Sequence, residues 1–130
     1  IYYKTMKSFF YVFIGGGLGS VFRFAISKLI FVSKGGVPWP TIFANLIGCF
    51  LIGLLLGWVI KNNGEKSELY FLLIVGFCGG LTTFSTFSNE GLLFLKSADY
   101  SNFLIYLVSS VVGGIILVGL GYYIFRLVNS

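Results

Sequence analysis

A dense group of hydroxyl and aromatic side chains lies in the second half of the chain. The segment TTFSTFS covers residues 82–88. On a helix Phe84 and Phe87 are three residues apart and share a face, and Ser85 and Ser88 share the neighbouring face. A hydroxyl donates a hydrogen bond and the edge of an aromatic ring is electropositive, so this set favours a small anion over a cation. The simpler interpretation is a row of phenylalanines that contact lipid or the core.

Polar residues also interrupt the apolar runs on either side of this segment, where each is expensive and therefore a functional hypothesis. Arg23 either extends toward lipid headgroups or attracts an anion at a pore mouth. Asn45 either joins helices, which is slightly favoured, or donates a hydrogen bond into an ion path. Glu90 either carries a proton or bonds nearby polar groups, and its place near a helix exit favours the structural role.

A further polar stripe is expected near the C-terminus of the chain. Tyr106 and Ser110 are four residues apart and so share a helix face. The next positions on this stripe are Gly114 and Val118, so the polar character fades after Ser110.

The sequence has few residues that could bind a transition metal, form a disulfide or catalyse a reaction. The sequence has no histidine, which excludes imidazole metal sites and histidine proton relays. Cys49 and Cys78 lie deep in apolar runs, and we interpret both as small packing residues. No nucleophile–base pair, metal-ligand set or phosphate-binding loop can be assembled, so an enzyme is not expected.

The elements that position these residues are predicted to be membrane-spanning helices in a single domain, residues 1–130. Hydrophobic residues make up 57% of the sequence and charged residues 10%, against about a quarter charged in a soluble domain. The mean hydropathy is +0.96. Long continuous apolar runs favour helices over barrel strands and predict four spans, at about 8–31, 39–60, 68–95 and 102–128. No cleavable signal peptide is expected, because the first run contains Arg23 and lacks a small-residue cleavage site.

Glycines and hydroxyls predict a break in the third helix and close packing throughout. Glycine and the hydroxyl residues both disfavour an uninterrupted helix, which places the break near residues 79–83. Small residues recur at four-residue spacing on all four helices, which predicts a tight bundle and an oligomer. These pairs are Gly15 with Gly19, Gly53 with Gly57, Gly76 with Gly80, and Ser109 with Gly113.

The basic residues give only a weak signal of membrane orientation. One side collects Lys4, Lys7, Lys61, Lys66 and Arg126, and the other Lys28, Lys34, Lys96 and Arg23. A definite orientation needs a clear Lys/Arg excess on one side. Two alternatives therefore stay open: insertion both ways up with an antiparallel dimer, or one orientation with both termini in the cytoplasm.

Three segments together resemble a known family. GFCGGLTTFSTFSNE, together with TIFANLIGCFLIG around Asn45 and GGGLGSVFRF in the first helix, is similar to the Fluc/CrcB fluoride channels. The resemblance covers essentially the whole chain, and GGLTTFSTFS is its most specific part.

The resemblance implies an antiparallel homodimer of four-helix subunits, inserted in both orientations in the inner or plasma membrane of a prokaryote. Two pores would let fluoride leave the cytoplasm passively, and no nucleic acid would be bound. A structural sodium ion at the dimer centre would be held by the backbone carbonyls of Gly79 and Thr82. Phe84, Phe87 and Asn45 would line the pore, and Arg23 its vestibule. The polar track would comprise Thr41, Ser85, Ser88, Tyr106 and Ser110, with Glu90 and Thr83 supporting it. The sequence departs from the family pattern at Gly114 and Val118, where many members carry hydroxyls.

Two other functions remain as alternatives. A small proton-coupled drug exporter would share the size and the four helices, but such proteins depend on an acid in the first helix, where this chain has Arg23. A structural subunit of a larger complex would not need the phenylalanines and hydroxyls of residues 82–88 together.

Overall fold

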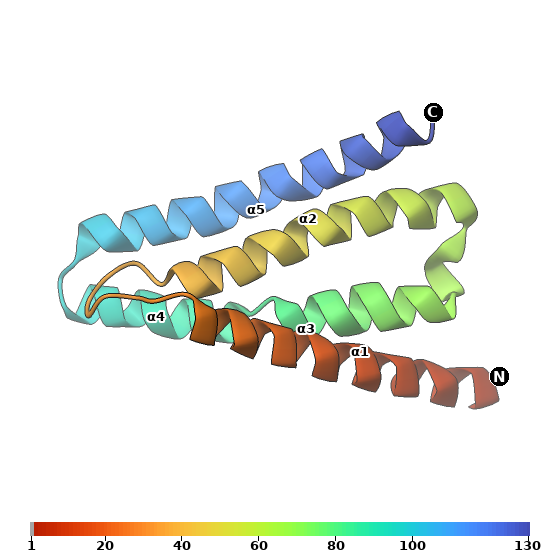
Figure 1. Cartoon of the computed structure of the whole chain (residues 1–130), viewed down its shortest axis with the longest axis horizontal. Helices are drawn as coiled ribbons and strands as arrows, with labels where there is room; N and C mark the ends of the chain where they lie inside the picture. Colours follow the sequence, from red (N-terminus) through yellow and green to blue (C-terminus); the bar gives the residue numbers. More distant parts are fainter. Residues whose placement is uncertain (1) are drawn as a thin grey trace.

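The computed structural model describes residues 2–130, with side chains from residue 5 onward, so the side chain of Lys4 lies outside the described part. The described chain is helical throughout, with short connections (Figure 1). In chain order the elements are α1 (Tyr2–Leu29), α2 (Trp39–Asn62), η1 (Gly64–Lys66), η2 (Tyr70–Cys78), α3 (Gly79–Leu81), α4 (Phe84–Lys96) and α5 (Tyr100–Val128).

The four predicted apolar helices are confirmed. Four segments are long and apolar enough to cross a membrane: Thr5–Leu29, Trp39–Asn62, Tyr70–Lys96 and Tyr100–Val128. The N- and C-termini lie at the same end of the molecule, and residues 30–38 and 97–99 connect helices at the opposite end (Figure 1).

The residue types at the starts of α2 and α5 explain why these helices begin where they do. Pro38 precedes α2 and Pro40 lies in its first turn, where a missing N–H has no intrahelical partner to lose. Asp99 caps α5 by accepting a hydrogen bond from the backbone N–H of Asn102 at 3.2 Å. The connection after α2 is more ordered than expected, because α2 extends to Asn62 and residues 64–66 form the 3-10 helix η1.

The first part of the third span, η2, is a π-helix, which was not predicted. A π-helix differs from an α-helix in bonding each N–H five residues back instead of four. The Gly79 N–H, for example, donates to the carbonyl of Ile74. Because this change of register leaves the pattern of apolar residues almost unaltered, the sequence gives no signal for it.

Two extended residues separate the two parts of the third span. Thr82 has φ −82° and ψ 153°, and Thr83 has φ −146° and ψ 123°. The hydroxyl oxygen of Thr83 then accepts a hydrogen bond from the Thr86 N–H at 3.2 Å and so caps α4.

Glycines allow the helices to approach backbone to backbone. A Cβ on Gly15 of α1 would collide with the carbonyl oxygen of Leu72 in η2. On the other side of the bundle, a Cβ on Gly53 of α2 would collide with the carbonyl oxygen of Val118 in α5. On α5 the closest approach falls at Gly121 rather than at the predicted pair Ser109 and Gly113.

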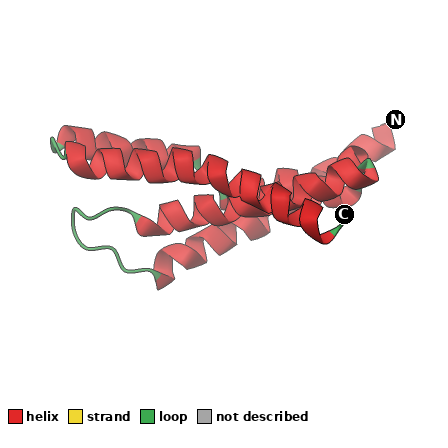
Figure 2. Ribbon diagram, turned by 90° about the horizontal axis from the view of Figure 1, so that it is seen from above, coloured by secondary structure: helices red, strands yellow, loops and turns green. Residues whose placement is uncertain are grey.

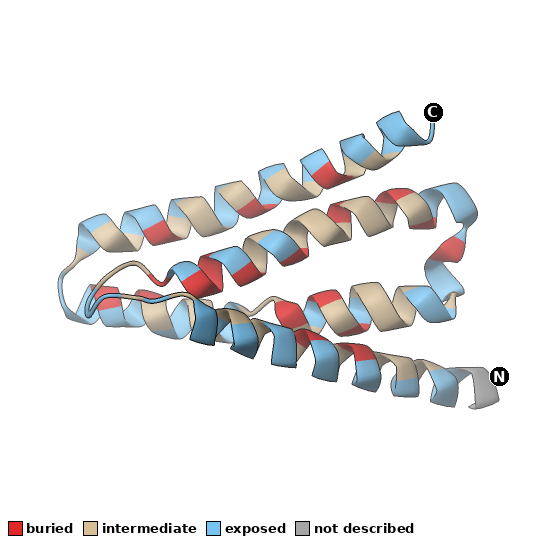
Figure 3. Ribbon diagram, viewed as in Figure 1, coloured by how far each residue is buried: buried red, intermediate tan, exposed pale blue. Residues whose placement is uncertain are grey.

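The buried core is small, and most large apolar side chains face outward. Buried positions lie along the sides of the helices that face one another (Figure 3). The principal cluster joins Ile42, Phe94 and Tyr106. By contrast, Phe13 is 79% and Phe84 80% exposed. Such an apolar exterior requires lipid or another protein around it.

Candidate functional site

The side chain of Asn45 bridges from α2 to the extended residues of the third span. Its Nδ2 donates to the carbonyl of Thr83 at 3.2 Å, and its Oδ1 accepts from the Thr83 N–H at 2.7 Å. Because Thr83 is extended, its N–H has no intrahelical acceptor, and the amide oxygen of Asn45 takes that place. The amide nitrogen adds a second bond, to the carbonyl of the residue that caps α4. This geometry agrees with a helix-joining role, and it places Asn45 beside the break.

Glu90 joins three helices through its carboxylate. The Thr41 hydroxyl of α2 donates to Oε1 at 3.1 Å, and the Tyr106 hydroxyl of α5 donates to Oε2 at 2.5 Å. Tyr106 is fully buried and Thr41 is 8% exposed. A part-buried carboxylate is stabilised by such charge-assisted partners, so these bonds are consistent with the structural role expected for Glu90.

A row of aromatic rings extends from the surface of α4 to Tyr106 in the buried cluster. The ring centroids of Phe84 and Phe87 are 5.9 Å apart, and those of Phe87 and Tyr106 are 5.0 Å apart. Phe87 is half-buried, whereas Phe84 is 80% exposed. The two phenylalanines therefore occupy different environments in one subunit.

The predicted polar track divides into two groups. Thr41 and Tyr106 lie inside the subunit, whereas Ser85 and Ser88 are exposed on α4 beside Phe84. Ser110 lies one turn beyond Tyr106. Within the described part of the chain, its Oγ is the buried side-chain polar atom without a hydrogen-bond partner. A buried hydroxyl left unsatisfied is costly, which marks this position as one where an acceptor would be stabilised.

Gly114, the next position after Ser110 on the stripe that begins at Tyr106, faces the sulfur of Cys49. A Cβ on Gly114 would lie 3.3 Å from the Sγ of Cys49. A side chain at residue 114 would therefore be in tight contact with Cys49, which gives a packing reason for the glycine found there. Cys49 and Cys78 are both free cysteines, as their interpretation as packing residues requires.

Arg23 lines a cavity of about 470 Å³ at the end opposite the termini. Its Nε donates to the carbonyl of Gly80 at 3.2 Å, close to the end of α3. The helix ends joined by residues 30–38 diverge there from the ends joined by residues 97–99 (Figure 2). The cavity contains one cation and one carboxylate, and its walls are Ser20, Arg23, Phe24, Ser27, Val32, Pro38, Pro40, Thr41, Thr83, Thr86 and Glu90.

Three polar residues of this wall were not named as site residues from the sequence: Ser20, Ser27 and Thr86. Ser20 and Ser27 stand three residues before and four after Arg23, a helical spacing that would have revealed one polar face on α1. Thr86 accepts a hydrogen bond from the Thr83 hydroxyl at 3.1 Å, which only the extended conformation of Thr83 makes possible.

Of the two predicted cation ligands, Gly79 is the first residue of α3 and Thr82 is the first of the two extended residues. In an uninterrupted helix the Thr83 N–H would donate to the Gly79 carbonyl, but here it donates to Asn45. Thr82, in contrast, directs both its N–H and its hydroxyl to the carbonyl of Cys78, at 3.0 and 2.9 Å. Among the described residues no three His, Cys, Asp or Glu side chains gather as a metal site. A cation held here would thus depend on backbone oxygen.

The chain is similar in sequence to one protein family and to individual proteins of known name. A family model described as "CrcB-like protein, Camphor Resistance (CrcB)" matches residues 10–122. Three similar proteins are each named "Fluoride-specific ion channel FluC". The protein of Azobacteroides pseudotrichonymphae is 41% identical over 118 residues, covering 90% of this chain and 94% of its own. That of Phocaeicola vulgatus is 43% identical over 117 residues, covering 89% and 96%. That of Leptospira interrogans is 44% identical over 110 residues, covering 84% and 87%.

Proposed function

The chain belongs to the CrcB-like protein family, and on that premise we propose that it is a passive, fluoride-selective channel through which fluoride leaves the cytoplasm. The proposal is supported above all by the relatives named fluoride-specific ion channels, which match most of this chain at 41–44% identity. Those relatives are channels and not enzymes. We assign the protein to the inner or plasma membrane of a prokaryote as a multi-pass protein with four spans.

The fluoride path is assigned to Phe84, Phe87, Asn45 and the polar track, with Arg23 in the vestibule. Fluoride is strongly hydrated, so a pore must replace its water with donors in series without holding the ion too firmly at any one site. The unpartnered Ser110 hydroxyl and the contact between Phe87 and Tyr106 at 5.0 Å support this path.

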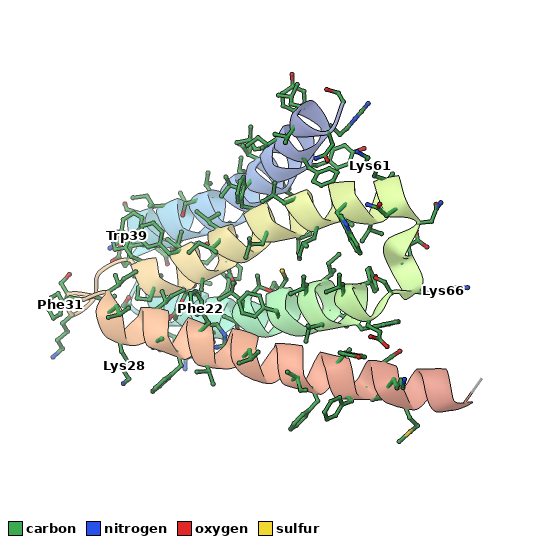
Figure 4. All side chains as sticks on the ribbon, turned by 45° about the vertical axis from the view of Figure 1, so that its right-hand side comes forward. Phe22, Lys28, Phe31, Trp39, Lys61 and Lys66 are labelled. Carbon is green, nitrogen blue, oxygen red and sulfur yellow. The ribbon has the colours of Figure 1, made fainter. Side chains whose placement is uncertain are left out.

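Two antiparallel subunits would complete two pores. Phe84, Ser85 and Ser88 are exposed on one subunit, and hydroxyls facing lipid would be costly. A second copy that covers α4 would remove this cost. The distribution of charge is compatible with insertion both ways up, since Lys61 and Lys66 lie at one end and Lys28 at the other (Figure 4).

A structural sodium ion is assigned to the carbonyls of Gly79 and Thr82. Carbonyls of unwound segments within membranes are suitable ligands for sodium. The diversion of the Thr83 N–H to Asn45 frees the Gly79 carbonyl from that hydrogen bond and supports the assignment. Two carbonyls are too few for one cation, so the partner subunit would supply the rest. When bound, the ion would raise the local positive potential.

Efflux from liposomes that contain the purified protein tests the function. A fluoride-selective electrode should record rapid fluoride release, whereas chloride-loaded vesicles should release little chloride on the same timescale. Retention of fluoride, or equal release of both ions, would overturn the proposal. Uptake of a cationic dye driven by a pH gradient would support the drug exporter instead, and no conductance for any halide would support the structural subunit.

A further inference from the structure

A second hollow lies at the end of the molecule that carries the termini, away from the residues assigned to fluoride. It has a volume of about 580 Å³ and lies between α1 and the start of η2. Its walls are Thr5, Lys7, Ser8, Phe9, Tyr11, Val12, Lys66, Glu68, Phe71 and Val75. None of these residues lines the cavity that contains Arg23.

The walls of this hollow are charged toward the helix ends and apolar toward the middle of the spans. Lys7 lies in the first turns of α1, and Lys66 and Glu68 precede η2. All three are exposed. Phe71 and Val75 follow within the third span, which begins at Tyr70. A site with charges at the membrane boundary and apolar walls below it is complementary to an amphiphile.

The carboxylate of this hollow makes a contact between α1 and the residues just before η2. The Tyr11 hydroxyl of α1 donates to Oε2 of Glu68 at 2.7 Å, across 57 positions of sequence. This bond fixes an acid between helices at a position where the neighbouring wall residues Lys7 and Lys66 are basic. Both signs of charge are therefore presented together, whereas a site for a purely anionic lipid would be expected to contain only cations.

We propose that this hollow binds a membrane phospholipid whose headgroup carries a phosphate and a primary ammonium, as phosphatidylethanolamine does. The phosphate contacts Lys7 and Lys66, and the ammonium contacts Glu68. The acyl chains lie along Phe71 and Val75. The inference does not depend on fluoride conduction, because it concerns a different surface and its test measures lipid retention.

Native mass spectrometry of the purified protein, with lipid added in detergent, tests the proposal. Phosphatidylethanolamine should be retained more strongly than phosphatidylglycerol with the same acyl chains. The double substitution Lys7→Gln, Lys66→Gln should weaken its retention roughly 25-fold, at about fivefold for each lysine near a membrane surface. Glu68→Gln should abolish the preference over phosphatidylglycerol. The matched control is Lys34→Gln, Lys96→Gln, which removes two lysines at the opposite end and should retain lipid as the unaltered protein does.

Three results would overturn the proposal. The first is equal retention of the two lipids by the unaltered protein. The second is equal weakening by the two double substitutions, which would indicate a general effect of charge. The third is competition by glycerophosphoethanolamine, which lacks acyl chains, at the same concentration as the lipid, since the occupant would then be a soluble ligand. Because the three substituted side chains in the hollow are exposed, their loss should leave the fold intact, and gel filtration of each variant checks this.

Discussion

Asn45 and Thr83 are joined by two hydrogen bonds that connect one side-chain amide to both backbone polar groups of one residue. The distances are 3.2 Å from Nδ2 to the carbonyl oxygen and 2.7 Å from Oδ1 to the amide nitrogen. The amide oxygen replaces the backbone acceptor that the Thr83 N–H would have in an uninterrupted helix. Its consequence is that α2 fixes the position of Phe84, the first residue of α4.

Asn45→Asp should abolish fluoride efflux and destabilise the subunit. A carboxylate cannot donate, so the bond to the Thr83 carbonyl would be lost and two electronegative oxygens would face each other, at a cost of about 1–3 kcal/mol. Efflux and thermal unfolding of the reconstituted variant measure the two effects. Asn62→Asp is the matched control, because Asn62 donates to the Trp58 carbonyl at 2.8 Å at the exposed end of α2. If Asn45→Asp conducts fluoride at the full rate, Asn45 does not contribute to the fluoride path.

Tyr106→Phe should lower stability by roughly 1–3 kcal/mol, because it removes a donor from a part-buried carboxylate and leaves the ring contacts in place. Fluoride efflux should fall with it, since Glu90 would no longer be held between α2 and α5. The control is Tyr123→Phe, which removes the same hydroxyl from a residue that is 59% exposed. Equal stability of the two variants, measured by thermal unfolding, would contradict the role given to this hydrogen bond.

Phe84→Ile and Phe87→Ile should separate the pore role from the packing role. Phe84 is 80% exposed on the single subunit, so its loss should change the stability of the subunit's own fold by less than about 0.5 kcal/mol yet slow efflux about tenfold, the effect of losing one favourable ring contact. Phe87 packs against Tyr106, so Phe87→Ile should abolish efflux and also lower the unfolding temperature. Phe31→Ile, at a position 89% exposed beyond the end of α1, is the control and should match the unaltered protein. Unchanged efflux in both test variants would exclude the rings from the path.

The sequence predicted the helices well because a membrane imposes a length and a composition that can be read directly. Four apolar runs became four spans. Thr82 and Thr83, the extended residues, lie within or beside the glycine- and hydroxyl-rich stretch expected to disfavour a helix.

What the sequence could not supply were the partners of individual polar atoms. The bond from Arg23 to the Gly80 carbonyl requires knowing which helix lies beside α1, and no local pattern states this. The π-helical register of η2 is hidden for a similar reason, because it is a property of backbone bonding and not of side-chain order. The assignment of individual residues to a fluoride path stays a prediction until conduction by variants is measured.

Gly53→Ala should be one of the most damaging single-methyl changes outside the polar site. Its Cβ would collide with the Val118 carbonyl oxygen, so α2 and α5 must separate, and overpacking of this kind costs about 1–3 kcal/mol. Gly119→Ala provides the same change where no atom lies within 4 Å of the added carbon, and the higher helix propensity of alanine should make it neutral or slightly stabilising. Thermal unfolding and gel filtration of both variants in one detergent measure the difference. If the two variants unfold at the same temperature, backbone contact between α2 and α5 does not hold the bundle together. If only Gly53→Ala is destabilised, the spacing of these helices, and with it the position of Tyr106 relative to Thr41, is set by the absence of a side chain at one residue.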